Sequence, residues 1–186
     1  MRVLIADDEA LTRLGLRTML QEMGHAVVGT AADGPTALQL AQETRPDLAI
    51  LDIKMPGMDG LSVAETIADL CPMPVLMLTA YSEREFIARA AAASVQAYLV
   101  KPIREADLAL SIELATTRFA EWQALRQEAA DLREALAARE VIAQAKQVLM
   151  QHHGLAEHEA FIEIQCRARR QRRTMCQIAQ EILTTT

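Results

Sequence analysis

Acidic and polar side chains follow several short apolar runs, and their types suit metal-assisted phosphoryl transfer. They are Asp7 and Asp8 after Val3–Ala6, Asp52 after Leu48–Leu51, Thr79 after Val75–Leu78, and Lys101 after Ala97–Val100. Three carboxylates that lie close together repel one another unless a divalent cation lies among them, and ligands that are all oxygen favour Mg²⁺. A carboxylate beside such a cation can attack phosphorus as a nucleophile. The residue types therefore predict a magnesium-dependent site that accepts a phosphoryl group.

Each of these side chains has its own expected role. Asp52 stands alone after its apolar run and is the expected nucleophile, whereas the adjacent Asp7 and Asp8 are better placed to hold the cation. Lys101 can offer an ammonium group, and Thr79 a hydroxyl group, to the oxygens of the transferred phosphoryl group. One site would then combine a nucleophile, a cation and two groups that contact the phosphoryl oxygens.

These residues come together if the apolar runs are strands of a parallel sheet. The runs, with one more at Ala26–Thr30, alternate with segments whose apolar residues are spaced three and four apart, as in helices. Near-continuous apolar strands need cover on both faces, which predicts an α/β fold with helices on both sides. The carboxyl ends of such strands meet at one edge, where ligands bind. At this edge the Lys101–Pro102 bond is a candidate for the cis form.

The same residues carry a family resemblance. D-D-E after the first run, D-I-K-M-P-G-M-D-G after the third, L-T-A after the fourth and K-P after the fifth together resemble the receiver domain of bacterial response regulators, over residues 1–118. The resemblance implies a flavodoxin-like, doubly wound, five-stranded parallel sheet. It also implies that a sensor histidine kinase of a two-component system phosphorylates Asp52.

The resemblance further assigns the metal ligands and the switch residues. It implies that Mg²⁺ is held by Asp8, Asp52 and the backbone carbonyl of Lys54, with Asp7 assisting. It implies that the hydroxyl of Thr79 swings toward the acyl phosphate and that an aromatic ring three residues before the lysine rotates inward behind it. Tyr98 occupies that aromatic position.

The second half of the chain is expected to be helical. Between Glu105 and His153 there is neither proline nor glycine, which predicts one long helix that runs on from the receiver. Its seam alternates spacings of three and four at Trp122, Leu125, Ala129, Leu132, Leu136, Arg139 and Ala143. This pattern fits a short coiled coil over residues 119–140, and it fits equally well a helix packed on its own domain.

After this helix the pattern predicts two shorter ones. Gly154 can end the long helix as the residue after its C-cap. Apolar spacing around Phe161 predicts a second helix, and Thr174 with Gln177 forms the pattern of a capping box that opens a third. Five arginines lie within the seven positions 167–173, which makes the junction between these helices a candidate anion-binding surface.

The segment A-Q-A-K-Q-V-L-M-Q-H-H-G-L-A-E-H-E-A-F at 143–161 resembles the ANTAR domain of transcription antitermination regulators. The resemblance begins near Trp122 and implies a coiled-coil helix followed by a small all-α module, with residues 141–186 as the RNA-binding core. It implies binding to paired RNA hairpins in nascent leader transcripts. The candidate RNA contacts are Lys146, Arg167, Arg172, Arg173 and Thr174.

Three positions depart from the ANTAR pattern. Gln147 stands where glycine is usual and could block close approach of the RNA backbone, and Arg169 stands where methionine is common. Ala156 replaces the Ser or Thr that would cap the second helix, which weakens the cap by roughly 1 kcal/mol.

Composition agrees with a cytoplasmic regulator of two parts. Residues 1–140 carry 13 Lys+Arg and 21 Asp+Glu, whereas residues 141–186 carry 6 and 4, so that the basic tail is the part expected to meet a polyanion. No apolar run is long enough to span a membrane, and no signal peptide is recognisable. The three cysteines are expected to be reduced and buried. We expect a regulator that is not an enzyme and that forms a homodimer on activation.

Two other functions are compatible with the tail. The last two helices could form a DNA-binding helix-turn-helix, although the third helix would present Met175, Cys176, Gln177 and Gln180 to the groove, a poor set for reading bases. The near-neutral charge of the tail also allows a module that binds only protein.

Overall fold

The computed structural model describes residues 1–80 and 95–185, and its first half contains a parallel sheet of five strands. The strands are β1 (Arg2–Ala6), β2 (Ala26–Ala31), β3 (Leu48–Asp52), β4 (Val75–Thr79) and β5 (Ala97–Val100), in the spatial order β2-β1-β3-β4-β5. This is the flavodoxin-like order. The strands begin and end within one residue of the apolar runs, so the expected sheet is confirmed.

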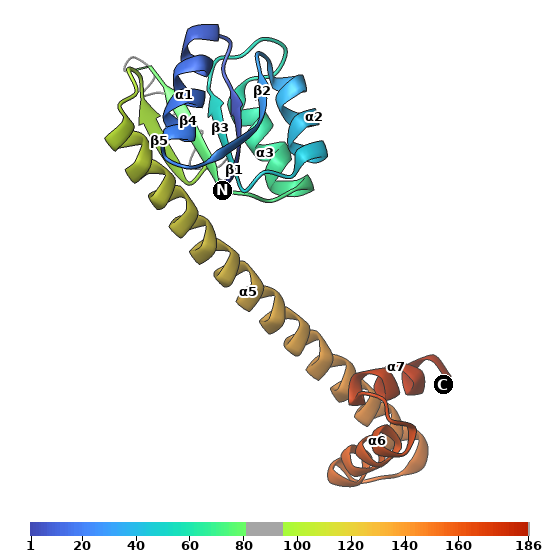
Figure 1. The fold of residues 1–186 in the computed structure, drawn as a ribbon. Helices are drawn as coiled ribbons and strands as arrows, with labels where there is room; N and C mark the ends of the chain where they lie inside the picture. The colour runs from blue at the N-terminus through green and yellow to red at the C-terminus, as the bar shows by residue number, and fades with distance from the viewer. Residues whose placement is uncertain (81–94, 186) are drawn as a thin grey trace. The chain divides into compact units, whose positions relative to one another are not determined.

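Helices cover both faces of this sheet (Figure 1). On one face α1 (Ala10–Glu22) and the first turns of α5 (Glu105–His153) pack on the strands, with Leu16, Leu20, Leu108 and Ile112 buried against them. On the other face lie α2 (Gly34–Thr44) and α3 (Gly60–Leu70). Burial on both faces explains why the central strands β3 and β4 are apolar at nearly every position. A helix expected between β4 and β5 falls in residues 81–94, outside the described residues.

The helix α5 runs unbroken over 49 residues, as the absence of proline and glycine predicted. It ends at His153. Gly154 follows with a φ of +66°, the left-handed conformation expected just after a helix, and its N–H donates to the carbonyl of Met150. The chain divides into two compact units, Met1–Gln123 and Ala124–Thr186.

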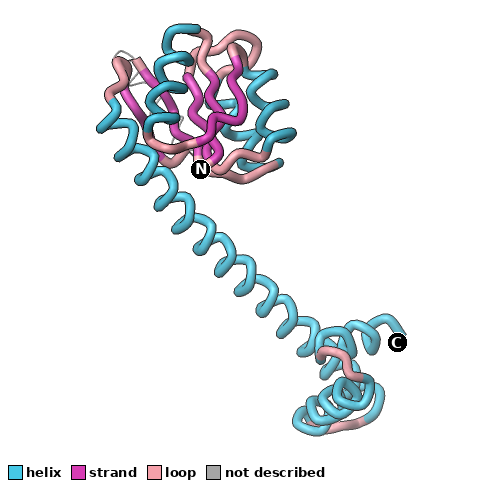
Figure 2. Tube along the Cα trace, in the orientation of Figure 1, coloured by secondary structure: helices cyan, strands magenta, loops and turns pink. Residues whose placement is uncertain are grey.

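The second unit has its own hydrophobic core. The end of α5 packs with α6 (Glu157–Gln171) and α7 (Met175–Thr185) around Ala145, Leu149, Ile164 and Ile178, all of them buried. In the tube of Figure 2 short loops separate these three helices. The all-helical module predicted from the sequence is therefore confirmed.

Hydrogen bonds at two helix starts account for where α6 and α7 begin. Thr174 Oγ1 accepts a hydrogen bond from the N–H of Gln177, and the Gln177 side chain accepts one from the N–H of Thr174, which confirms the capping box. At α6, Ala156 offers no side-chain acceptor, as expected, but the Glu159 carboxylate accepts from the Ala156 N–H at 2.8 Å. Half of a capping box therefore remains at this position.

One expectation about the cysteines is wrong. Cys166 is exposed on α6, and Cys71 and Cys176 are only partly buried, so none of the three is the buried core residue that composition favoured. Helix α6 turns position 166 away from its buried residues Ala160, Ile164 and Ala168. No helix in residues 1–80 and 95–185 is long and apolar enough to cross a membrane.

Candidate functional site

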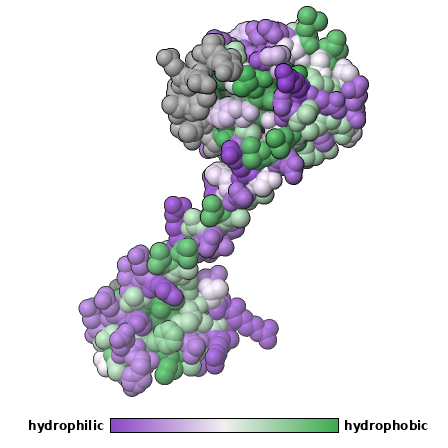
Figure 3. Space-filling view, turned by 90° about the vertical axis from the view of Figure 1, so that its left-hand side faces the viewer, coloured by the Kyte–Doolittle hydropathy of each residue, from purple (hydrophilic) through white to green (hydrophobic). Residues whose placement is uncertain are grey.

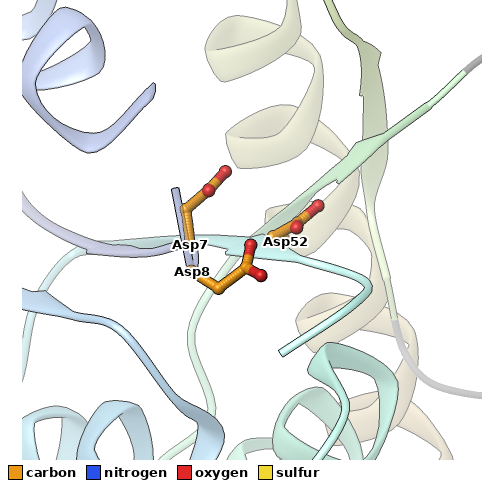
Figure 4. Close-up of side chains that lie close together, drawn as sticks. All are labelled: Asp7, Asp8 and Asp52. Atoms are coloured by element: carbon orange, nitrogen blue, oxygen red, sulfur yellow. The ribbon is translucent and has the colours of Figure 1, made fainter. Parts of the chain in front are cut away.

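Three carboxylates converge at the carboxyl ends of β1 and β3. Asp7 and Asp8 come directly after β1 and Asp52 ends β3, and one oxygen of each lies within 4.8 Å of the others. Figure 4 shows the three side chains beside one another. Asp7 and Asp52 are buried, whereas Asp8 is exposed. The sequence predicted this cluster because parallel strands bring their ends to one edge.

Lys101 lies between two of these carboxylates. Its Nζ is 2.8 Å from Asp7 Oδ2 and 3.2 Å from Asp52 Oδ2. Burial tends to lower the pKa of Lys101, but the hydrogen bond to Asp7 and the charge of Asp52 outweigh it and hold that pKa above its ordinary value. The expected cis form of the Lys101–Pro102 bond is confirmed. Lys101 thus contacts two of the three carboxylates, and Arg13 donates only to the backbone carbonyl of Asp7, so the three acidic side chains are not fully balanced by ion pairs.

The environment of Asp52 affects its ionisation. Burial raises the pKa of its carboxyl group to about 6; Lys101 opposes this rise and Asp7 adds to it. At pH 7 and above the group is therefore mainly the carboxylate, which is the nucleophilic form.

Two residues that position the site were not singled out from the sequence. The backbone N–H of Glu9 donates to Asp7 Oδ1 at 2.8 Å and fixes the orientation of that carboxylate. Gly60 packs directly on the backbone of Asp52, because a Cβ at position 60 would lie 2.0 Å from the Asp52 carbonyl oxygen. The D-D-E and M-D-G sequences carried both signals, but only the folded geometry shows what these two residues contact.

Thr79 and Tyr98 lie near this edge on β4 and β5. Thr79 is buried at the end of β4, and its hydroxyl donates to the Ala80 carbonyl at 3.1 Å. Tyr98 pairs with Met77 in the sheet register. Its hydroxyl is buried without a hydrogen-bond partner among the described residues, and burial raises the pKa of this phenol. Lys54 is exposed two residues after β3.

In the second unit Lys146 already has a partner. It lies on α5 and is partly buried, and its Nζ is 2.6 Å from Glu157 Oε1 at the start of α6. Hydrogen bonding and the charge of Lys146 hold the pKa of Glu157 below its ordinary value. No pattern in the sequence indicates this pair, since the two residues are eleven positions apart and on different helices. Gln147, where glycine was expected, is exposed beside it.

The other candidate RNA contacts gather at the junction of α6 and α7. Arg172 is the C-cap of α6 in the left-handed conformation, and Arg173 and Thr174 follow it. Arg173 forms an ion pair with Glu181, and Arg167 on α6 forms one with Glu163 at 2.7 Å. Arg169 is exposed.

Two of the candidate RNA contacts, Lys146 and Arg167, line different hollows. Lys146 lines one together with Glu157, His158, Phe161 and Ile162. Arg167 lines another together with His153, Glu181 and apolar side chains of α5 and α7. The structure therefore brings Arg172, Arg173 and Thr174 together, and Glu181 connects Arg173 to the hollow that Arg167 lines, whereas Lys146 lines the other hollow.

Comparison with known families decides what these two parts are. Residues 3–113 match the model of the response regulator receiver domain, and residues 130–183 match that of the ANTAR domain. The chain belongs to the response regulators that carry an ANTAR domain. Both matched domains are regulatory: receiver domains bind Mg²⁺ at an acidic pocket and are phosphorylated by sensor kinases, and ANTAR domains bind RNA.

Individual relatives agree with this family. The chain is 46% identical over 184 residues to the transcriptional regulatory protein PdtaR of Mycobacterium tuberculosis. The aligned region covers 99% of this chain and 90% of that protein. It is 40% identical over 119 residues to the positive alginate biosynthesis regulatory protein of Pseudomonas aeruginosa. That aligned region covers 62% of this chain and 47% of that protein.

Solved structures resemble the receiver part. The receiver domain of a modulated diguanylate cyclase from Desulfovibrio desulfuricans has a TM-score of 0.60 at 32% identity, over 64% of this chain and 95% of that one. The CheX–CheY–BeF₃–Mg²⁺ complex of Borrelia burgdorferi has a TM-score of 0.57 at 27% identity, over 60% of this chain and 86% of that one.

Proposed function

We propose that this response regulator accepts a phosphoryl group on Asp52 from a sensor histidine kinase and then controls gene expression by binding RNA and antiterminating transcription. The observation that supports this most strongly is the cluster of Asp7, Asp8 and Asp52 with Lys101 between two of them, in a chain that also matches an ANTAR domain.

Asp52 is the proposed phosphoacceptor. Its carboxylate attacks phosphorus, one carboxylate oxygen forms the new P–O bond, and the phosphorus–nitrogen bond to the kinase histidine breaks. The imidazole of the kinase leaves with the electron pair and takes up a proton. Lys101 lies 3.2 Å from Asp52, so its ammonium group is close enough to contact an oxygen of the transferred phosphoryl group.

The carboxylates also suit a magnesium ion. All three offer hard oxygen ligands within 4.8 Å of one another, and a single ammonium group does not offset their charge. Asp7, Asp8, Asp52 and the backbone carbonyl of Lys54 are the proposed ligands. When bound, Mg²⁺ neutralises the charge of the approaching phosphoryl group.

Thr79 and Tyr98 are the proposed reporters of phosphorylation. The Thr79 hydroxyl donates to the adjacent Ala80 carbonyl at 3.1 Å, a weak local bond that a phosphoryl oxygen can replace. The buried Tyr98 hydroxyl gains a partner if the ring moves. We expect Thr79→Ala to label normally with a small phosphodonor yet to lose most of the response in RNA binding or dimerisation. A variant that labels and responds like the parent would contradict the switch role.

The kinase needs a surface beside Asp52, and α1 offers one. Leu11 and Leu14 are exposed there, next to a groove lined by Glu9, Met19 and Lys101 among others. Exposed apolar side chains in this position favour contact with another protein. The groove includes Lys101, which itself contacts the phosphoacceptor.

RNA binding is proposed to use the basic residues of the second unit. Arg172, Arg173 and Thr174 form one proposed contact surface at the junction of α6 and α7. Arg167 lines a hollow together with Glu181, the ion-pair partner of Arg173, and Lys146 lines another hollow. Arginine side chains and helix N-termini bind phosphates and loop bases without aromatic platforms. With one tryptophan and three phenylalanines in the chain, stacking on aromatic rings is a minor part of the proposed recognition.

Phosphorylation is proposed to act through a monomer–dimer equilibrium. Two joined effector modules bind two hairpins at once, which raises the apparent affinity through effective concentration. Replacing Leu132 and Leu136 together by aspartate should keep the protein monomeric, and it should then bind tandem hairpins no better than a single hairpin. Sedimentation with and without beryllium fluoride measures this directly.

The phosphoacceptor is tested by incubation with a small phosphodonor and measurement of the incorporated label. The parent should incorporate label only when Mg²⁺ is present, and Asp52→Asn should incorporate none. Label on Asp52→Asn equal to that on the parent, or label without a divalent cation, would contradict the assignment.

A DNA-binding regulator is the alternative proposal, with α6 and α7 as a helix-turn-helix. The residues that α7 would offer to a groove, such as Cys176 and Gln177, speak against it. Titration of the phosphorylated protein with a structured leader hairpin and with duplex DNA of equal length, at one stated salt concentration, separates the two. Preference for the duplex would favour the alternative.

A further inference from the structure

Glutamates neutralise half of the basic side chains in residues 141–186. This segment contains six basic and four acidic side chains. Three of the glutamates each form an ion pair with a candidate RNA contact, in the pairs Lys146–Glu157, Arg167–Glu163 and Arg173–Glu181. The fourth, Glu159, accepts a hydrogen bond from the N–H of Ala156. A phosphate that approaches any of the three paired basic residues must therefore compete with a carboxylate that is already in contact.

The other three basic residues lie within four positions at the end of α6. Arg169 and Arg170 belong to the last turn of α6, Arg172 is its C-cap, and all three are exposed. Within residues 1–80 and 95–185, no carboxylate forms an ion pair with any of them. Figure 3 shows hydrophilic side chains over much of the visible face of this unit. Three positive charges are therefore left without a neutralising partner at one end of α6.

From this distribution of charge we infer that Arg169, Arg170 and Arg172 form a phosphate-binding surface that attracts RNA to the second unit. A basic side chain that contacts a phosphate releases a cation condensed on the nucleic acid, and this release favours binding at low salt. An arginine that is already paired contributes less, because the phosphate only replaces a carboxylate. The inference rests on the proposed RNA binding and adds two contacts, Arg169 and Arg170. Arg169 departs from the ANTAR pattern, so this surface is a property of this chain.

A role in helix stability is the competing explanation for Arg169 and Arg170. Positive charges in the last turn of a helix interact favourably with the partial negative charge of its C-terminus. Loss of that role would lower the melting temperature but would leave the salt dependence of RNA binding unchanged. The salt dependence therefore separates the two explanations.

The test measures RNA binding by the full chain, with Mg²⁺ and beryllium fluoride, over a series of salt concentrations. The probe is a synthetic RNA stem-loop of arbitrary loop sequence, because contacts with phosphates do not read bases. The variant carries Arg169→Gln and Arg170→Gln. Arg172 stays unchanged, because its left-handed conformation also ends α6. Glutamine is a good helix former, so the variant should keep this helix.

The expected change follows from the number of phosphate contacts removed. Each contact contributes about 0.7–0.9 to the slope of the logarithm of the binding constant against the logarithm of the salt concentration. Loss of two contacts should therefore make this slope shallower by about 1.4–1.8. If binding extrapolated to about 1 M salt is unchanged, affinity at about 0.1 M salt should fall about 25- to 60-fold.

Two matched variants serve as controls. Arg169→Lys with Arg170→Lys keeps both charges, so its slope should equal that of the parent. Arg167→Gln with Arg173→Gln removes the same number of charges from the same unit. Its slope should change by less than half as much, because both arginines already lie against carboxylates.

The possible outcomes separate this inference from the proposed function. A parent slope in the variant with glutamine at 169 and 170, whatever its melting temperature, would overturn the inference and leave the proposed function standing. An equal change in the variant with glutamine at 167 and 173 would also overturn it, since paired arginines would then contribute as much as unpaired ones. A parent that does not bind the stem-loop even at low salt would overturn the inference together with the proposed RNA binding.

Discussion

Replacing Asp52 by asparagine should stabilise the receiver unit at neutral pH when no Mg²⁺ is present. Burial raises the pKa of Asp52 from 3.8 to about 6, so over that range the folded protein keeps a proton that the unfolded chain has released. Because the folded state binds more protons, the free energy of unfolding falls as the pH rises through this range. Above about pH 6 the carboxyl group is ionised in both states, and its burial lowers the free energy of unfolding by a constant amount.

The size of this cost follows from the pKa shift. A rise of about two pKa units corresponds to about 3 kcal/mol once both states are ionised. Asparagine keeps the shape of the side chain but carries no charge, and Lys101 keeps its contact with Asp7 at 2.8 Å. The variant should therefore gain about 1–3 kcal/mol of unfolding free energy at about pH 7.5.

Urea unfolding followed by circular dichroism in the presence of a chelator measures this gain. At about pH 4 the carboxyl group is protonated in the folded state, and the gain should nearly disappear. Mg²⁺ at ten times its dissociation constant should stabilise the parent by about 1.4 kcal/mol and the variant by less. A variant less stable than the parent at about pH 7.5, or a gain that is the same at about pH 4, would show that the buried Asp52 carboxylate does not destabilise the fold.

Three further outcomes are expected. Gly60→Ala should lower the unfolding free energy by about 2 kcal/mol and reduce phosphorylation, because its Cβ would lie 2.0 Å from the backbone oxygen of Asp52. The control Gly15→Ala in α1 should be neutral or stabilising, because the nearest atom to its Cβ, in the Met19 side chain, is 4.0 Å away. Equal melting temperatures for the two variants would contradict the packing argument. Glu157→Gln should tighten hairpin binding about threefold by releasing Lys146 from its 2.6 Å ion pair, and unchanged binding in a filter assay would count against Lys146 as an RNA contact. Leu14→Asp should slow phosphorylation by the kinase about tenfold or more but leave labelling by a small phosphodonor unchanged, and equal loss with both donors would reject α1 as the docking surface.

The sequence predicted the sheet and the long helix well, for simple reasons. Five short apolar runs that alternate with helical segments are typical of strands covered on both faces. A segment of 49 residues without proline or glycine has nothing to interrupt a helix. The convergence of Asp7, Asp8 and Asp52 followed from the parallel order of the strands alone.

Contacts between side chains distant in sequence could not be predicted. The position of Lys101 between Asp7 and Asp52 depends on where β5 ends, and the pairing of Lys146 with Glu157 depends on how α6 packs on α5. The exposure of Cys166 depends on the rotation of α6, which composition does not specify. In each case local sequence determines the helix or strand, and tertiary packing decides what its side chains meet.

Sequencing of RNA cross-linked to the protein in cells tests whether Asp52 controls RNA binding, and the RNA target does not have to be chosen in advance. The parent and Asp52→Asn are expressed at equal levels with the signalling pathway active, and bound RNA is recovered from each. The parent should enrich leader transcripts with paired hairpins. Asp52→Asn should recover at least about tenfold less of these transcripts, because the variant cannot gain the affinity of a second hairpin. Equal recovery of the same transcripts by both proteins, or enrichment of no structured RNA by the parent, would contradict this prediction.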